Sequence, residues 1–160
     1  MKFILGTPQF GMKYGIANSI RPNLKELNKI KKTIILKKIK FLDIAENYGN
    51  SEKIIKQFNL KNINIITKIK VSDRINSRNL ESYFINKIKQ SIRRIGVKKI
   101  FCLLLHDVRD AKSKNSISYF KSLKMLKKLG LIKHYGVSVY EPSDIQKILE
   151  LWTPEFIQIP

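Results

Sequence analysis

The 160-residue sequence predicts a parallel α/β fold in a single domain, residues 1–160. Two observations support this. Short apolar segments rich in β-branched residues recur along the chain, and continuous apolar strands are typical of a parallel sheet covered by helices. Amphipathic helical patterns lie between them, and no linker or change of composition marks a second domain. Strands that alternate with helices in this way form right-handed β-α-β units.

Six segments are predicted to be buried strands because each is a short apolar run ended by polar or turn-forming residues. They are FILGT (3–7), FLDIA (41–45), INIITKI (63–69), IFCLLLH (100–106), YGVSVY (135–140) and FIQIP (156–160).

Five helices are predicted between the strands, from apolar residues spaced three and four apart. We expect Ser51 to cap the second of them through its hydroxyl group. Gly130 is the expected C′ residue that ends the fourth. The predicted helices cover residues 24–34, 51–58, 80–95, 116–129 and 143–150.

Two architectures fit this order of elements: an open, doubly wound sheet and a closed barrel. A complete barrel of eight β/α units needs about 250 residues. As a barrel, the chain would therefore be incomplete, with about six of the eight units.

The composition excludes several classes of protein. Lys and Arg number 32 against 12 Asp and Glu, a net charge of +20, but 26 of the basic residues are Lys and they are spread along the chain. Because Arg is the residue that reads bases and phosphates, we expect no nucleic acid as the main partner. The longest apolar run, 100–105, is far shorter than the roughly 20 residues of a membrane span, so no membrane partner is expected. A single Cys and the absence of a signal-peptide pattern favour the cytoplasm.

Nucleotide-binding and metal motifs are missing. Gly6 and Gly11 have the spacing of a phosphate-binding loop, but Lys13 is followed by Tyr14 where the motif needs Ser or Thr. No G-x-G-x-x-G occurs. One Cys and two His give no ligand spacing for zinc, so no metal is expected.

Titratable residues instead follow three of the predicted strands. Asp43, Lys68 and His106 lie at or near the ends of strands, and Tyr48 follows the strand that carries Asp43. Parallel strands collect their active sites at their carboxyl ends, and charged groups there are costly to bury unless they are paired. We therefore expect these side chains to face each other.

Their chemistry is complementary. The pKa of a tyrosine is near 10, and the Lys68 cation would stabilise the phenolate and lower that pKa. Asp43 would keep Lys68 charged, and His106 could donate a hydrogen bond to a substrate oxygen. Tyr48 would then act as a general acid that protonates a carbonyl oxygen.

Here the sequence resembles a known family. The stretch FLDIAENYGNSE (41–52) is similar to the D-x-A-x-x-Y-G-x-S-E signature of the aldo-keto reductases. The segments ITK (66–68), LLH (104–106) and YGVS (135–138) follow in the family's order, and LGTPQFGMKYGIAN (5–18) resembles its first strand and loop.

The resemblance implies a TIM barrel and reduction of a small aldehyde or ketone, such as a sugar-like carbonyl, to an alcohol with NADP(H) or NAD(H). The catalytic tetrad would be Asp43, Tyr48, Lys68 and His106. Ser138 and Gln158 would bind the nicotinamide carboxamide, whereas Val139 stands where the family has Asn.

The same resemblance implies that the family's last two strands lie beyond Pro160. We therefore expect a C-terminally truncated barrel whose open edges allow self-association. The rival hypothesis is a non-catalytic remnant or partial product that cannot bind the cofactor.

Overall fold

The computed structural model describes residues 3–15, 20–71, 75 and 77–159. Six parallel strands form one sheet in the order β1-β2-β3-β4-β5-β6, so each strand pairs with its neighbours in the sequence. The strands are β1 (Ile4–Gly6), β2 (Phe41–Asp43), β3 (Asn64–Ile69), β4 (Ile100–Leu105), β5 (Ile132–Ser138) and β6 (Phe156–Gln158).

Seven helices and one 3-10 turn lie among the described residues. The five predicted helices are confirmed as α2, α3, α4, α6 and α7, whereas α1, α5 and the turn η1 were not predicted. The bounds are α1 (Pro8–Gly11), α2 (Leu24–Leu36), α3 (Ser51–Phe58), η1 (Ser77–Asn79), α4 (Leu80–Ile95), α5 (Val108–Lys112), α6 (Ser116–Lys128) and α7 (Pro142–Leu151).

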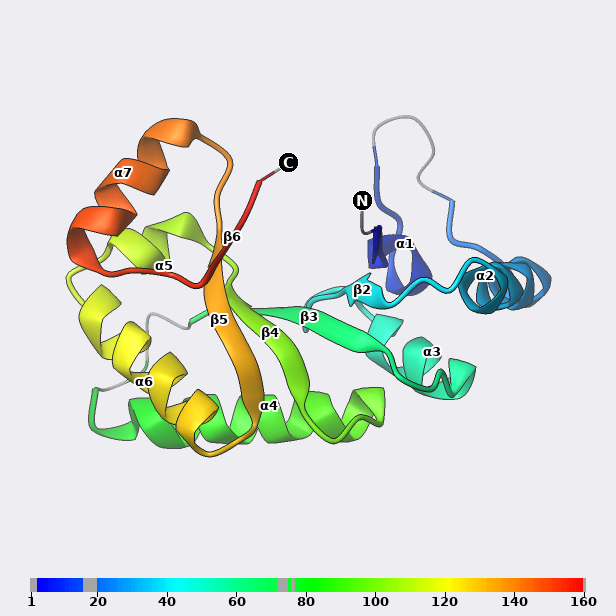
Figure 1. Ribbon diagram of the computed structural model, residues 1–160, viewed down its shortest axis with the longest axis horizontal. Coiled ribbons are helices and arrows are strands. Elements are labelled where there is room, and N and C mark those ends of the chain that lie inside the picture. Colours follow the sequence, from blue (N-terminus) through cyan, green and yellow to red (C-terminus); the bar gives the residue numbers. More distant parts are fainter. Residues whose placement is uncertain (1–2, 16–19, 72–74, 76, 160) are drawn as a thin grey trace.

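The sheet curls into a half-barrel with helices outside it (Figure 1). This confirms the barrel-type fold with about six of eight units, and it excludes the doubly wound alternative, in which strand order reverses. β1 and β6 each pair with one strand only, on the side of β2 and of β5. The sheet that the described residues form is therefore open between β1 and β6.

The core has two parts. The larger part packs the outer face of the sheet against the helices, and Phe84 of α4, Leu123 of α6 and Ile148 of α7 are fully buried in it. The smaller part lies inside the curl, where Ile66 and Leu104 are packed against partly buried aromatic rings. The site described below shares this inner face.

Three local predictions differ in their outcome. The prediction for Gly130 is confirmed: its φ is 71°, and the next amide group bonds back to Leu126 O at 3.1 Å. The prediction that Ser51 caps α3 is wrong, because the N-cap residue is Asn50 and the Ser51 hydroxyl bonds Thr7 instead. The sixth strand ends at Gln158, and Pro160 lies outside the described residues.

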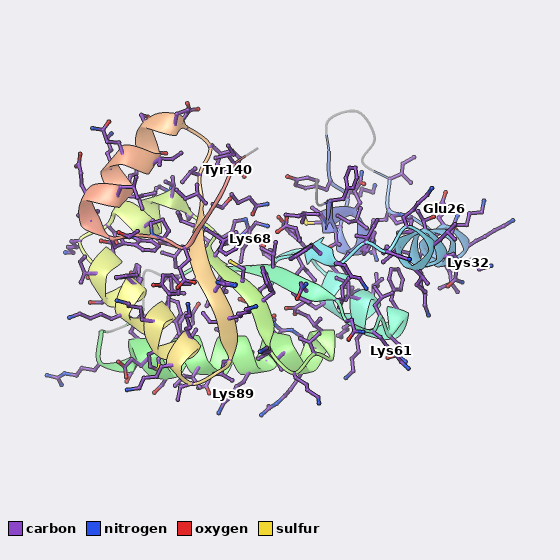
Figure 2. All side chains as sticks on the ribbon, in the orientation of Figure 1. Glu26, Lys32, Lys61, Lys68, Lys89 and Tyr140 are labelled. Atoms are coloured by element: carbon purple, nitrogen blue, oxygen red, sulfur yellow. The ribbon has the colours of Figure 1, made fainter. Side chains whose placement is uncertain are left out.

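Most lysine side chains lie on the helices and loops around the sheet. Figure 2 shows Lys32, Lys61 and Lys89 pointing away from the molecule, whereas Lys68 lies at its centre. Within the part of the chain that the structure describes, no helix has the length and apolar character needed to cross a membrane.

Candidate active site

Asp43 and Lys68 form an ion pair on the inner face of the sheet. Asp43 ends β2 beside Ile66 of β3, and Lys68 stands two residues further along β3, so its side chain emerges on the same face as that of Ile66. The Lys68 ammonium group donates a hydrogen bond to Oδ1 of Asp43. Lys68 is only 5% exposed and Asp43 only 8% exposed. Charges buried this deeply persist because each has its partner.

Tyr48 lies beside this pair, in the loop that joins β2 to α3. The residue is 9% exposed, and Lys68 Nζ lies 5.5 Å from the centre of its ring. Among the described residues, the ammonium bonds Asp43 and not the Tyr48 hydroxyl group. The phenol therefore stands near a cation that another group already neutralises.

His106 comes directly after β4 and completes the group. Its backbone N–H donates to Ile69 O at 2.9 Å, which continues the pairing of β3 and β4 by one residue. Its ring lies edge-on to that of Tyr48, with 6.2 Å between the ring centres. Four side chains from three consecutive β/α units thus meet at the carboxyl ends of the strands, where parallel barrels build their sites.

Ser138 and Gln158 end β5 and β6 and are partners in the strand register. The Gln158 amide donates from Nε2 to Oδ2 of Asp43 at 3.3 Å. Its Oε1 is buried and has no hydrogen-bond partner among the described residues. Val139, at the position where the family resemblance implies Asn, is fully buried and offers no polar side-chain atom.

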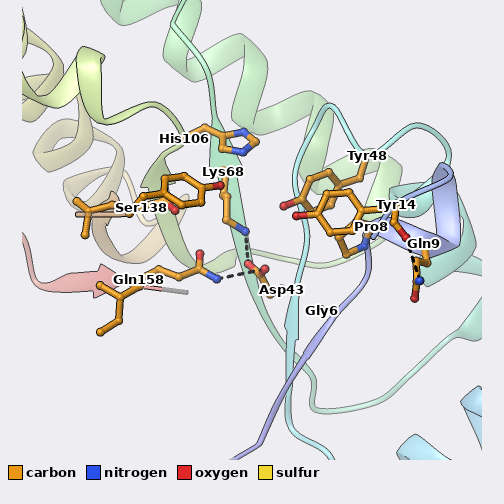
Figure 3. Close-up of a pocket in the computed structure, with 13 residues that line it drawn as sticks. Gly6, Pro8, Gln9, Tyr14, Asp43, Tyr48, Lys68, His106, Ser138 and Gln158 are labelled. Atoms are coloured by element: carbon orange, nitrogen blue, oxygen red, sulfur yellow. Dashed lines mark hydrogen bonds and ion pairs between the residues drawn. The ribbon is translucent and has the colours of Figure 1, made fainter. Parts of the chain in front are cut away.

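All six predicted site residues line one cavity of about 430 Å³. Figure 3 shows Lys68 and Gln158 converging on Asp43, with His106 above them and Tyr48 facing them across the cavity. The structure thus brings together the side chains that were predicted from the ends of the strands. Other lining residues were not predicted as site residues: Gly6, Pro8, Gln9, Tyr14, Val139, Tyr140 and Ile159.

Tyr14 and Tyr140 are the notable additions. The Tyr14 ring lies 6.3 Å from that of Tyr48, and both added tyrosines line the cavity. Tyr140 comes two residues after β5, so its position at a strand end was a signal that could have found it. Tyr14 follows α1 and carries no such signal.

The pKa of Tyr48 differs from the sequence prediction in direction. Burial raises the pKa of the phenol well above its ordinary value, and the negative charge of Asp43 raises it further. The prediction of a lowered pKa is wrong for this arrangement, because burial of the phenol is the largest effect and the Asp43 charge acts in the same direction. Burial also lowers the pKa of Lys68, although Asp43 partly opposes that effect.

Burial lowers the pKa of His106 as well, and the nearby Lys68 cation adds to the effect. His106 is therefore a neutral imidazole at pH 7, able to donate one hydrogen bond. With a protonated Tyr48 beside it, the cavity presents two neutral donors above a buried ion pair. Such donors can bond a carbonyl oxygen and stabilise negative charge that develops on it.

Binding of a metal ion needs several ligand side chains that lie close together. Within residues 3–15, 20–71, 75 and 77–159, no group of three or more His, Cys, Asp or Glu side chains is arranged to hold a metal ion.

Comparison with known structures places the fold. A putative aldo-keto reductase from Pseudomonas aeruginosa superposes with a TM-score of 0.73 at 20% identity, over 98% of this chain and 61% of that chain. An aldo-keto reductase from Bacillus halodurans, in its holo form, gives 0.75 at 19% identity over 99% and 52%. The glycerol dehydrogenase from Gluconobacter oxydans gives 0.65 at 21% identity over 98% and 50%. This chain thus spans between half and about three-fifths of the length of these proteins.

No curated protein matches the sequence. The sequence model described as the aldo/keto reductase family, in contrast, matches residues 2–159, nearly the whole chain. The motifs around Asp43, Lys68 and His106 lie within that match and at the strand ends expected for them. The chain therefore belongs to the aldo/keto reductase family.

Proposed function

We propose that the protein reduces an aldehyde or ketone to an alcohol with NADP(H) or NAD(H), and that Tyr48 is the general acid. The observation that carries this proposal is the convergence of Asp43, Tyr48, Lys68 and His106 on one cavity. Membership of a family of carbonyl oxidoreductases supports the reaction class.

The four residues would divide the work as follows. Tyr48 donates the proton of its hydroxyl group to the carbonyl oxygen as negative charge develops there, and its raised pKa keeps that proton in place beforehand. His106 donates a hydrogen bond to the same oxygen. Once Tyr48 has lost its proton, the nearby Lys68 cation stabilises the phenolate, and Asp43 keeps Lys68 charged and oriented.

Two residues fit the amide group of a nicotinamide. The buried Oε1 of Gln158 lacks a donor among the described residues, and the Ser138 hydroxyl lines the same cavity, so together they would hold a carboxamide. When bound, the nicotinamide supplies the hydride. Val139 removes one polar contact of this kind, and we expect weaker binding for that reason.

The substrate would be a small carbonyl compound. One of the similar structures is a glycerol dehydrogenase, and the notable polar lining of the cavity, with Gln9, Tyr14 and Tyr140, suits a hydroxylated, sugar-like molecule. We assign the protein to the cytoplasm, where a buried free thiol such as that of Cys102 stays reduced.

The decisive variant is Tyr48→Phe. It should reduce turnover of a simple aldehyde by at least about a hundredfold while NADPH affinity, measured by fluorescence quenching, is retained. Tyr119→Phe is the matched control, because Tyr119 is equally buried but lies in α6, outside the cavity. Unchanged turnover in Tyr48→Phe would contradict the assigned acid.

The second candidate function is a non-catalytic remnant or partial product. It is favoured by the hydrogen bond of Gln158 to Asp43, which occupies a group needed for the cofactor. Absence of NADPH binding at high micromolar concentration would support this candidate and remove the enzymatic one. We also propose that the open strands β1 and β6 allow self-association.

A further inference from the structure

Two hydroxyl groups outside the cavity connect Asp43 of the proposed ion pair with the loop that carries the proposed acid, Tyr48. Thr7 follows β1, and Ser51 begins α3; both residues are fully buried. Neither lines the cavity. Buried hydroxyl groups are retained at a cost unless they are hydrogen-bonded, so their partners show what they hold in place.

Thr7 is bonded twice to the same atom. Its backbone N–H donates to Asp43 O at 3.0 Å, and its Oγ1 donates to that oxygen at 2.9 Å. Asp43 is thereby fixed at its main chain, next to the side chain that bonds Lys68. Thr7 Oγ1 keeps its lone pairs free to accept a further bond.

Ser51 supplies that further bond. Its Oγ lies 2.9 Å from Thr7 O and 3.0 Å from Thr7 Oγ1, so its single proton is shared between two acceptors of one residue. The Ser51 backbone N–H donates to Tyr48 O at 3.1 Å. A continuous chain of hydrogen bonds therefore runs from Asp43 through Thr7 and Ser51 to the main chain of Tyr48.

The main chain of α1 also contacts the Tyr48 loop. A Cβ atom on Gly11 would lie 1.7 Å from Tyr48 O and 2.6 Å from Ser51 N, so only glycine allows this approach. The Tyr48 loop is thus held by the contact with Gly11 and by the hydroxyl pair.

We propose that Thr7 and Ser51 are positioning residues, which set the Tyr48 phenol relative to the Asp43–Lys68 pair. This inference rests on the proposed function, in which the distance between the phenol and that pair decides proton transfer. Removing the hydroxyl of Ser51 replaces no residue of the cavity and takes away only the hydrogen bonds from Ser51 to Thr7.

Steady-state kinetics of Ser51→Ala, Thr7→Val and Thr7→Ser test the proposal. Misplacement of reacting groups by about 1 Å can lower a rate a hundredfold, so we expect kcat to fall roughly tenfold to a hundredfold in Ser51→Ala, and by a smaller factor in Thr7→Val. KM for the cofactor should stay unchanged, because Ser138 and Gln158 are not touched. Thr7→Ser keeps the hydroxyl group and should retain wild-type kcat.

Ser122→Ala is the matched control. Ser122 is also a buried serine, and its hydroxyl donates to Ser118 O within α6, remote from the cavity. It should leave kcat unchanged. Equal kcat in Ser51→Ala and the wild type, with the wild type active, would overturn the positioning role and leave the proposed function standing.

Amide hydrogen exchange tests the positioning role of Ser51 without any measurement of activity. The Tyr48 and Ser51 amide groups, bonded to Ala45 O and Tyr48 O, should exchange faster in Ser51→Ala than in Ser122→Ala, while the amides of β4 are unaffected. An inactive wild type would contradict the proposed function alone. Exchange in the Tyr48 loop that is equal in the two variants would then overturn the positioning role separately.

Discussion

At the scale of single residues, the Asp43 carboxylate determines the electrostatics of the cavity. Its two oxygens accept from Lys68 and from Gln158, and its charge raises the pKa of Tyr48. A tyrosine in this setting is a proton donor that stays protonated. In the mechanism that we propose, Lys68 therefore stabilises the Tyr48 phenolate while its ammonium group stays bonded to Asp43.

Asp43→Asn tests the energetic weight of the pair. The variant leaves Lys68 buried without a counter-charge, and such losses cost about 3–5 kcal/mol of the free energy of unfolding. Lys68→Met should cost a similar amount, and the double variant should cost less than the sum of the two. Urea unfolding measures all three. Lys127→Met, which breaks the more exposed pair with Glu155, should cost under about 1 kcal/mol. Additive losses would show that the two buried charges do not depend on each other.

The lowered pKa of His106 predicts that the folded protein loses stability in acid. The pKa of His106 is lowered chiefly by burial, so below the ordinary histidine value of about 6.5 the unfolded chain binds a proton that the folded chain resists. Stability is then complete above that value and declines as the pH falls through it. Urea unfolding between about pH 8 and pH 5 should show this decline in the wild type and a smaller one in His106→Gln.

His134→Gln is the control for that measurement, because it removes the other histidine, whose ring contacts Glu155, and leaves His106 in place. The same decline in the wild type and in His106→Gln would show that protonation of His106 is not the cause.

The residue scale also marks the limit of the sequence prediction. Strand ends can be located from apolar runs, and this was enough to bring Asp43, Lys68 and His106 to one cavity. The direction of the Tyr48 pKa shift could not be predicted, because its largest cause is burial of the phenol, which depends on residues far apart in the sequence. Ser51 was assigned to a helix cap for a related reason: a local partner was the expected one, and the actual partner, Thr7, lies far away in the sequence.

At the scale of elements, Gly11 of α1 and Gly49 of the loop between β2 and α3 allow two main chains to touch. A Cβ atom on Gly49 would lie 2.4 Å from Gly11 O, and Gly49 has a φ of 56°. Buried packing of Phe10 of α1 against Phe58 of α3 holds the two elements together. A four-residue helix thus acts as the support for the loop that carries Tyr48.

Gly11→Ala should therefore be strongly destabilising. The new methyl group meets backbone atoms that cannot rotate away, and overpacking of this kind costs about 1–3 kcal/mol or more. Gly6→Ala is the matched control, since its nearest neighbour would be Pro8 Cδ at 3.8 Å. Thermal unfolding compares the two. A melting temperature for Gly11→Ala equal to that of Gly6→Ala would mean that the loop moves aside freely.

Helices and strands were predicted correctly where the run or period of apolar residues is long. The long helix α4 and the apolar strand β4 were predicted within a residue of their bounds. The short helices α1 and α5 were missed because four or five residues are too few for an apolar period to appear. The start of β5 at Ile132 was missed because Lys133 and His134 interrupt the apolar run in the sequence. In the structure the His134 ring packs against the rings of Phe101 and Phe156.

At the scale of the whole molecule, the half-barrel leaves apolar surface between its first and last strands. A second cavity, of about 460 Å³, is lined by Ile4 of β1, by Ile66 and Leu104 inside the curl and by Phe156 of β6. In a closed barrel these positions belong to the packed interior. The site residues thus sit on a scaffold whose inner core is open on one side.

This openness predicts association that depends on concentration. Ile4 is 54% exposed and Phe156 39% exposed, and both lie on strands with one free edge. Exposed, apolar edge strands pair with other chains, and a lysine on the edge opposes that pairing. Sedimentation velocity at micromolar to millimolar concentrations should therefore detect oligomers of the wild type and fewer oligomers of Ile4→Lys and Phe156→Lys.

Leu149→Lys distinguishes pairing of the edge strands from non-specific association through exposed apolar surface. Leu149 is as exposed as Ile4 but lies on α7, on the outside of the sheet, so its replacement by lysine should leave association unchanged. If Leu149→Lys reduces association as much as the edge variants do, the driving force is exposed apolar surface in general. If the wild type remains monomeric throughout, the free edges of β1 and β6 are protected, and the inner face is stable in water despite its apolar lining.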